Sequence, residues 1–185
     1  MTGISLPPKH EFPYFDRQFF TFIKRDMFHM RAPDFDDVKE AIEYRIEDIT
    51  EMLAPLEYEY AEFTAEEFYR FLKGDIFTPE SVTLRDILGN EYLMVHKIVE
   101  ASELKNRGIE LDEKTMKQAP REIVYSCHLM AVEFELDYAL LLEDYYWIKH
   151  RLPLHEKVLL DPDLPQELKS RAEDIQSHFR KYENY

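Results

Sequence analysis

Two histidines and two glutamates at helical spacing are the residues of this sequence best suited to bind a metal ion. His96 and Glu100 are four residues apart, and His128 and Glu135 are seven residues apart. In an α-helix, these spacings place both side chains of a pair on one face. Imidazole and carboxylate groups are common ligands of zinc, manganese and iron. The two pairs therefore predict a site for one of these metals, provided that the two helices face each other.

Glu91 is the fifth candidate ligand. At 100° per residue it falls on the apolar face of its predicted helix, together with Leu84, Leu88, Val95 and Ile98. An ionised carboxylate in a protein core is unfavourable unless it is paired. Glu91 is thus expected either to form an ordinary ion pair at the end of the core or to complete the ligand set.

The same pairs have a purely structural interpretation. His96 and Glu100 also fit an ordinary pair on a helix surface, and His128 and Glu135 fit a buried polar network that fixes how two helices align. The repeated Glu-x-x-His pattern of bundle di-iron proteins is absent, as is His-Glu-x-x-His. If a metal binds, a mononuclear centre is the version that the sequence favours.

Two other kinds of chemistry have less support. All-α nucleotide pyrophosphatases hold magnesium with paired carboxylates on helices, and this chain has glutamates at positions 40, 43, 47 and 51 and a Glu-x-x-Glu pair at 100 and 103. An acidic stripe, however, usually marks a solvated helix face. Cys127 and His128 are adjacent, so on a helix they point about 100° apart and form no nucleophilic dyad. With four glycines in the chain and no glycine-rich motif, no phosphate-binding loop is expected.

Hydrophobic periodicity predicts an all-α bundle of five or six helices to position these residues. The helices are expected at about 36–53, 64–74, 79–106, 120–152 and 165–182. The fourth is the longest and most apolar, so it is expected at the centre of the bundle.

Helix boundaries follow from local signals. Thr64 with Glu67 forms a capping-box pattern, and Gly89 followed by Asn90 is expected to bend or split the third helix. Gly108 is expected to end the third helix, and Pro153 is expected to end the long fourth helix.

The first 35 residues differ from the rest of the chain. They contain four prolines, which break helices, and many large apolar side chains: Phe12, Tyr14, Phe15, Phe19, Phe20, Phe22, Phe28 and Met30. Such an aromatic arm is unfavourable in water. We expect it to pack on the bundle or on a second subunit, within a single domain of residues 1–185.

Charge and composition exclude several classes of partner. The chain of 185 residues carries 38 acidic and 23 basic side chains, a formal net charge of -15, which repels nucleic acid. No apolar run approaches the ~20 residues of a membrane-spanning helix, so no membrane partner is expected. The single cysteine allows no intramolecular disulfide, which favours a cytoplasmic location.

Two segments are similar to parts of an uncharacterised family of archaeal all-helical proteins. These are residues 91–111, EYLMVHKIVEASELKNRGIEL, and residues 122–138. The resemblance implies an all-helical fold and names no activity, so it assigns no functional residue.

Two hypotheses for function remain at this stage. The first is an interaction or assembly protein, because no catalytic motif is recognisable and the aromatic arm suits a homo-oligomer. The second is a metal-binding helical bundle, with a metal-dependent hydrolase as one form of it. The sequence alone does not decide whether the protein is an enzyme.

Overall fold

A computed structural model of the chain describes residues 33–74, 82–183 and 185. The chain divides into two compact units, Met1–Asp34 and Phe35–Tyr185. All five candidate site residues lie in the second unit. The predicted aromatic arm falls in the first unit, and its residues 1–32 lie outside the described part of the chain.

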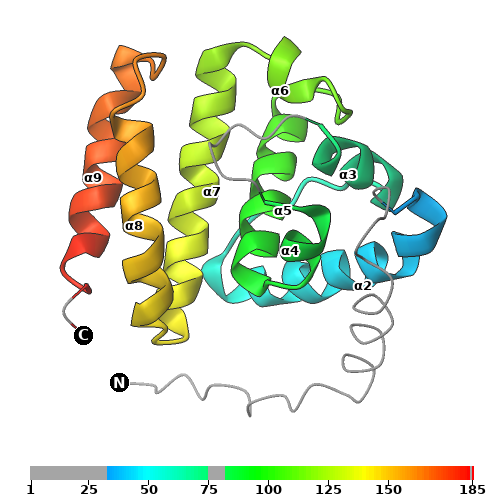
Figure 1. Ribbon diagram of the computed structural model, residues 1–185, viewed down its shortest axis with the longest axis horizontal. Coiled ribbons are helices and arrows are strands. Elements are labelled where there is room, and N and C mark those ends of the chain that lie inside the picture. The colour runs from blue at the N-terminus through cyan, green and yellow to red at the C-terminus, as the bar shows by residue number, and fades with distance from the viewer. Residues whose placement is uncertain (1–32, 75–81, 184) are drawn as a thin grey trace. The chain divides into compact units, whose positions relative to one another are not determined.

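The described residues form α-helices and no strand, which confirms the predicted all-α class (Figure 1). They make eight α-helices rather than the five or six expected, because two predicted helices are split and one short helix was not anticipated. The helices are α2 (Phe35–Leu53), α3 (Ala65–Leu72), α4 (Leu84–Leu88), α5 (Glu91–Asn106), α6 (Thr115–Gln118), α7 (Arg121–Leu141), α8 (Tyr145–Leu159) and α9 (Lys169–Arg180). Short 3-10 turns cover Ala54–Leu56 and Gln166–Leu168.

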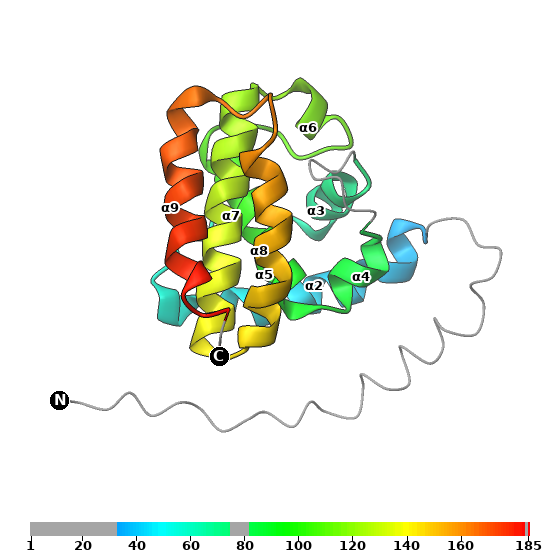
Figure 2. The same ribbon diagram turned by 60° about the vertical axis from the view of Figure 1, so that its left-hand side comes forward.

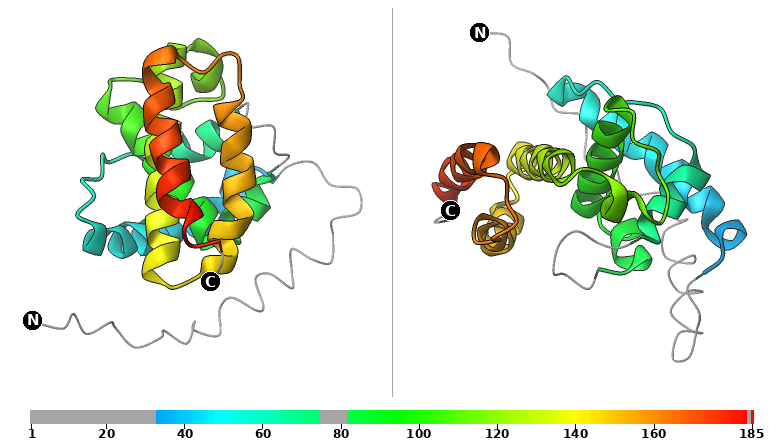
Figure 3. Two further views of the ribbon diagram at one scale, coloured as in Figure 1. Left: turned by 90° about the vertical axis from the view of Figure 1, so that its left-hand side faces the viewer. Right: turned by 90° about the horizontal axis from the view of Figure 1, so that it is seen from above.

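Helices α5 and α7 share the most extensive helix–helix contact of the helical unit. Helices α8 and α9 pack beside α7, whereas α2 and α4 contact α5 (Figures 1 and 2). Seen from above, α7, α8 and α9 run nearly along the line of sight, and α2 lies crosswise (Figure 3). The α5–α7 contact is therefore covered by other helices on both sides.

One hydrophobic core joins these helices. It contains fully or almost fully buried side chains from every long helix, among them Ile42, Phe68, Met94, Ile98, Leu129, Leu136, Leu152 and Phe179. Only the helix that begins at residue 120 was predicted to be central. Of the 16 residues of α5, 11 are buried, so α5 is central as well as α7. No helix in the described ranges is long and apolar enough to cross a bilayer.

Several predicted boundary signals are confirmed. Thr64 and Glu67 form a complete capping box at the start of α3. Asn90 caps α5 by accepting a hydrogen bond from the Leu93 amide, which separates α5 from α4. Gly108 has φ of 74°, the left-handed conformation that glycine adopts without strain just after a helix.

The predicted long helix from 120 to 152 is wrong in its last third, because α7 ends at Leu141. Glu143 adopts a left-handed φ of 57°. Its amide donates to the carbonyl of Leu140, and the Asp144 amide donates to that of Ala139, which is the Schellman pattern of helix termination. The Asp144 carboxylate then accepts a hydrogen bond from the Trp147 amide and begins α8.

Pro153 does not end a helix either. It lies inside α8, which continues to Leu159. A proline at this position removes the amide that would bond to the carbonyl of Lys149, yet the flanking Leu152 and Ile148 are fully buried. Burial of these side chains outweighs the tendency of Pro153 to end the helix.

Candidate metal centre

Helices α5 and α7 bring three of the predicted ligands together. One nitrogen or oxygen atom from each of His96, Glu100 and His128 lies within 4.8 Å of the others. Glu100 Oε1 is 3.9 Å from His96 Nε2 and 3.4 Å from His128 Nδ1. The side chains are at most 4% exposed. Around a tetrahedral ion with bonds of about 2.0–2.1 Å, neighbouring ligand atoms lie about 3.4 Å apart, so small shifts would complete such a geometry.

Glu135 fixes the orientation of His96. His96 Nδ1–H donates to Glu135 Oε2 over 2.9 Å. Because an ionised carboxylate only accepts hydrogen bonds, this contact assigns the proton to Nδ1 and leaves the lone pair on Nε2, which faces Glu100. A histidine held by a carboxylate in this way is the usual arrangement of a metal-binding imidazole.

Helix α8 supplies the groups that hold Glu135. Arg151 Nε lies 2.5 Å from Glu135 Oε1, and Trp147 Nε1–H donates to the same oxygen over 2.8 Å. Arg151 also donates to Oε2 over 3.0 Å. The carboxylate is fully buried, and these contacts offset the loss of its hydration.

Only one of the two carboxylate oxygens of Glu100 forms a hydrogen bond within the described residues. Its Oε2 accepts a hydrogen bond of 2.6 Å from the Lys97 ammonium. Its Oε1 is buried and forms no hydrogen bond within the described residues. Unsatisfied buried oxygens are rare, because each forgoes its interaction with water. This oxygen faces His96 and His128, so it is the atom of the cluster best placed to bind a cation.

The charge states follow from burial and from neighbouring charges. Burial acts to raise the pKa of Glu100, but the Lys97 ammonium and the two imidazoles outweigh it and hold this pKa well below its usual range. Burial also acts to raise the pKa of Glu135, and Arg151 together with His96 lowers it. Burial lowers the pKa values of His96 and His128, so both are neutral at pH 7. Neutral imidazole is the form that binds metals.

The other two predicted ligands have different places. Glu135 belongs to the cluster, but it holds His96 and does not belong to the group that converges on Glu100 Oε1. Glu91 lies outside the group. It is half-buried at the start of α5, where burial raises its pKa and its charged neighbours are Arg45, Asp48 and Asp144. The structure therefore does not bring Glu91 together with His96, Glu100 and His128, and its charged neighbours include Arg45 and Asp48 of α2.

Three side chains that contact the glutamates of the cluster were not predicted from the sequence, namely Lys97, Trp147 and Arg151. Trp147 and Arg151 are four residues apart, so they share a face of α8. That spacing was a usable signal, but only with the correct start of α8 at Tyr145. Lys97 lies next to His96 along the chain and reaches Glu100 as its i,i+3 neighbour.

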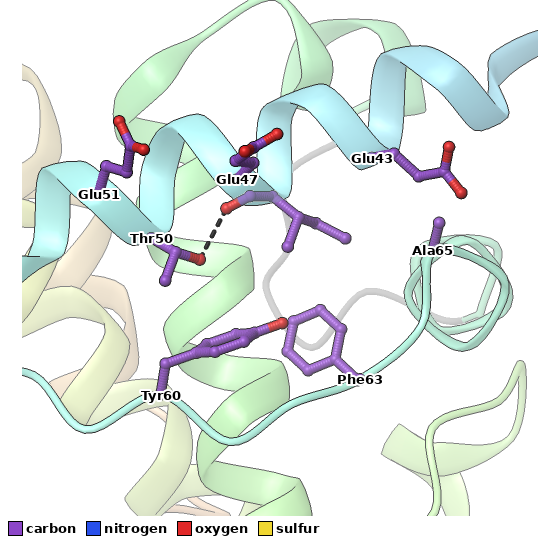
Figure 4. A pocket seen from close by; sticks show the side chains of 8 residues that line it. Glu43, Glu47, Thr50, Glu51, Tyr60, Phe63 and Ala65 are labelled. Atoms are coloured by element: carbon purple, nitrogen blue, oxygen red, sulfur yellow. Dashed lines mark hydrogen bonds between the residues drawn. The ribbon is translucent and has the colours of Figure 1, made fainter.

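The acidic stripe of α2 lies elsewhere and is solvated. Glu43, Glu47 and Glu51 are exposed along the edge of a shallow groove whose other side includes Tyr60 and Phe63 (Figure 4). Thr50 uses its hydroxyl to donate to the Ile46 carbonyl of its own helix. This supports the solvated-face interpretation over a magnesium site.

Glu103 does not pair with Glu100 as a second carboxylate. It accepts hydrogen bonds from Tyr58, at 3.1 Å, and from Arg107, at 2.5 Å. Cys127 is fully buried, and burial raises the pKa of its thiol to about 12. A thiol in that state is not a nucleophile at pH 7.

No protein-family model, curated protein sequence or solved structure matches this chain. The resemblance of residues 91–111 and 122–138 to archaeal helical proteins thus stays a prediction.

Proposed function

We propose that this protein binds one divalent transition-metal ion per chain, zinc or ferrous iron, between α5 and α7. The ligands would be His96 Nε2, Glu100 Oε1 and His128 Nδ1. The observation that carries the proposal is the buried Glu100 Oε1, which forms no hydrogen bond within the described residues and faces two imidazoles. A set of two histidines and one carboxylate suits both metals and leaves a coordination position for a small ligand.

Burial limits what such a centre would do. Because the three ligand side chains are at most 4% exposed, a large substrate would have no direct access to the ion. This favours a structural ion, or one that reacts with molecules the size of water or dioxygen, over the hydrolysis of a large substrate. An ion with an open position would act there as a Lewis acid or a redox centre.

The test is metal binding by the full-length, untagged protein. After treatment with a chelator and dialysis, zinc and ferrous iron would be added separately and the bound metal measured by elemental analysis. We expect about one equivalent for the wild type. Replacing one of three ligands in His128→Gln should weaken binding by at least about 100-fold, more than the loss of a group that only orients a ligand.

His155→Gln is the matched control. His155 is also a buried histidine, but its Nε2–H donates to the Ala172 carbonyl between α8 and α9. This variant should bind metal like the wild type. A wild-type protein that retains no zinc or iron, and whose melting temperature ignores both ions, would exclude the proposal.

Self-association is the second candidate function, in line with the interaction hypothesis. Leu142 is 46% exposed and Tyr146 is 79% exposed, and together with Leu141 they form an apolar surface at the turn between α7 and α8. Exposed apolar clusters often mark interfaces. Light scattering should give a dimer or larger species for the wild type and a smaller one for Tyr146→Ser. A wild type that is monomeric at high concentration would rule this out.

A further inference from the structure

Lys97 and a metal ion would bind the same carboxylate. The Lys97 ammonium lies 2.6 Å from Glu100 Oε2, and the proposed ligand atom is the other oxygen, Oε1. Two cations on one buried carboxylate repel each other strongly, because little water is present to screen them. The occupancy of one site therefore affects the other.

Each buried carboxylate of the cluster already has a cation beside it. Lys97 contacts Glu100 and Arg151 contacts Glu135, so two positive charges face two negative charges. A divalent ion would add two positive charges to a nearly dry site. Uncompensated buried charge is unfavourable, so binding requires a cation to leave or an anion to enter.

Lys97 is the cation better able to leave. The side chain of Arg151 is 7% exposed and holds both oxygens of Glu135. The side chain of Lys97 is 12% exposed, and its ammonium lies 5.8 Å from the centre of the Phe71 ring. A lysine has a flexible four-carbon stem that can carry its charge to water while the stem stays packed.

We propose that Lys97 is a displaceable counter-cation that sets the metal affinity of this centre. It neutralises Glu100 when no metal is bound, and its ammonium moves to solvent when the ion takes its place. Lys97 thereby stabilises the metal-free fold at the expense of affinity. This inference rests on the proposed function, and it adds a regulatory residue to that site.

The experiment compares zinc affinities of full-length wild type, Lys97→Met and Lys105→Met by competition with a chromophoric chelator at neutral pH. Methionine keeps the length of the stem and removes the charge. Lys105 is the matched control, because it is on the same helix and pairs with Glu67 at 2.7 Å, away from the cluster. We expect Lys97→Met to bind zinc at least about 10-fold more tightly than the wild type, and Lys105→Met to stay within about 2-fold of it.

Thermal melts supply a second readout. Lys97→Met should melt below the wild type in chelator, because Glu100 loses its counter-charge, and its melting temperature should rise more on adding zinc. Lys97→Gln replaces it if the methionine variant does not fold. Zinc binding by Lys97→Met that is equal to or weaker than that of a zinc-binding wild type overturns the displacement and leaves the metal centre standing. Failure of every variant, the wild type included, to bind either zinc or ferrous iron would overturn both.

Discussion

The buried cluster between α5 and α7 and the groove on α2 both contain glutamates in side-chain pairs at four-residue helical spacing. Glu43, Glu47 and Glu51 follow each other at four-residue intervals, as do His96 and Glu100. In the groove the carboxylates are exposed, and Glu43 has only a loose contact of 3.8 Å with Lys39. In the cluster both carboxylates are fully buried, and each has its own cation.

The two regions differ in what surrounds each carboxylate, which is water in the groove and protein side chains in the cluster. An exposed carboxylate keeps its hydration, so its neighbours matter little. A buried carboxylate depends on each contact that the fold provides, and losing one leaves a charge unpaired. The same residue pattern therefore has a small effect in one place and a large one in the other.

The largest expected contrast comes from removing one carboxylate in each region. Glu135→Ala removes the carboxylate that Arg151 contacts inside the core, and it also removes the acceptor of Trp147 and His96. We expect the free energy of unfolding to fall by about 3–5 kcal/mol. Glu47→Ala in the groove should change it by less than about 0.5 kcal/mol.

Urea denaturation followed by circular dichroism would measure both values in metal-free buffer. A loss below about 1 kcal/mol for Glu135→Ala, close to that of the surface variant, would mean that the cluster tolerates the loss of its Glu135–Arg151 pair and that the contrast between the two regions is wrong.

Acidification should weaken the buried region through its histidines. Burial lowers the pKa values of His96, His128 and His155 below the ordinary value of 6.5. Below pH 6.5 the unfolded chain binds protons that the folded chain does not, so stability falls as the pH falls. Between pH 6.5 and 5.5 we expect a loss of at most about 1 kcal/mol for each of these histidines, the value reached when the folded form takes up no proton.

Below pH 4.5 the lowered pKa values of Glu100 and Glu135 add a further loss in the same direction. Urea midpoints measured across this range test the sign. The variant His155→Gln should show a smaller decline above pH 5.5 than the wild type. Stability that is flat or rises on acidification from pH 6.5 to 5.5 would show that the histidines are protonated in the folded protein.

The smallest effect is expected in the groove. Glu43 and Glu47 are like charges four residues apart, which repel each other on a helix. Replacing both by glutamine should raise the free energy of unfolding by about 0.2–0.5 kcal/mol at low salt, and this gain should vanish at high salt. A loss of stability that persists in high salt would instead indicate a bound cation or a specific contact in the groove.

Part of the fold could be predicted because some signals are local. The capping box at Thr64 and the left-handed glycine at 108 depend on a few neighbouring residues, so the sequence identifies them. The break after Leu141 depends on Glu143 in a conformation that disfavours most side chains. It is supported by a tertiary contact, because the Tyr92 hydroxyl donates to Asp144 over 2.7 Å from another helix.

The candidate site divides in the same way. Helical spacing alone indicated His96, Glu100 and His128, and the structure brings them together. Arg151 and Trp147 reach Glu135 only because the chain reverses at Glu143. The predicted continuous helix through Glu143 would place both residues too far along the helix to contact Glu135. The cations beside Glu100 and Glu135 could therefore not be predicted from the sequence, and metal binding itself stays a prediction.

The fluorescence of Trp147 offers a way to follow the candidate metal centre. It is the single tryptophan of the chain, and its indole N–H bonds to the carboxylate that holds His96. Selective excitation of tryptophan therefore reports from one indole, which shares the Glu135 carboxylate with His96. A paramagnetic ion bound there would quench this fluorescence, whereas zinc would only shift it, so the indole would report which of the two ions binds.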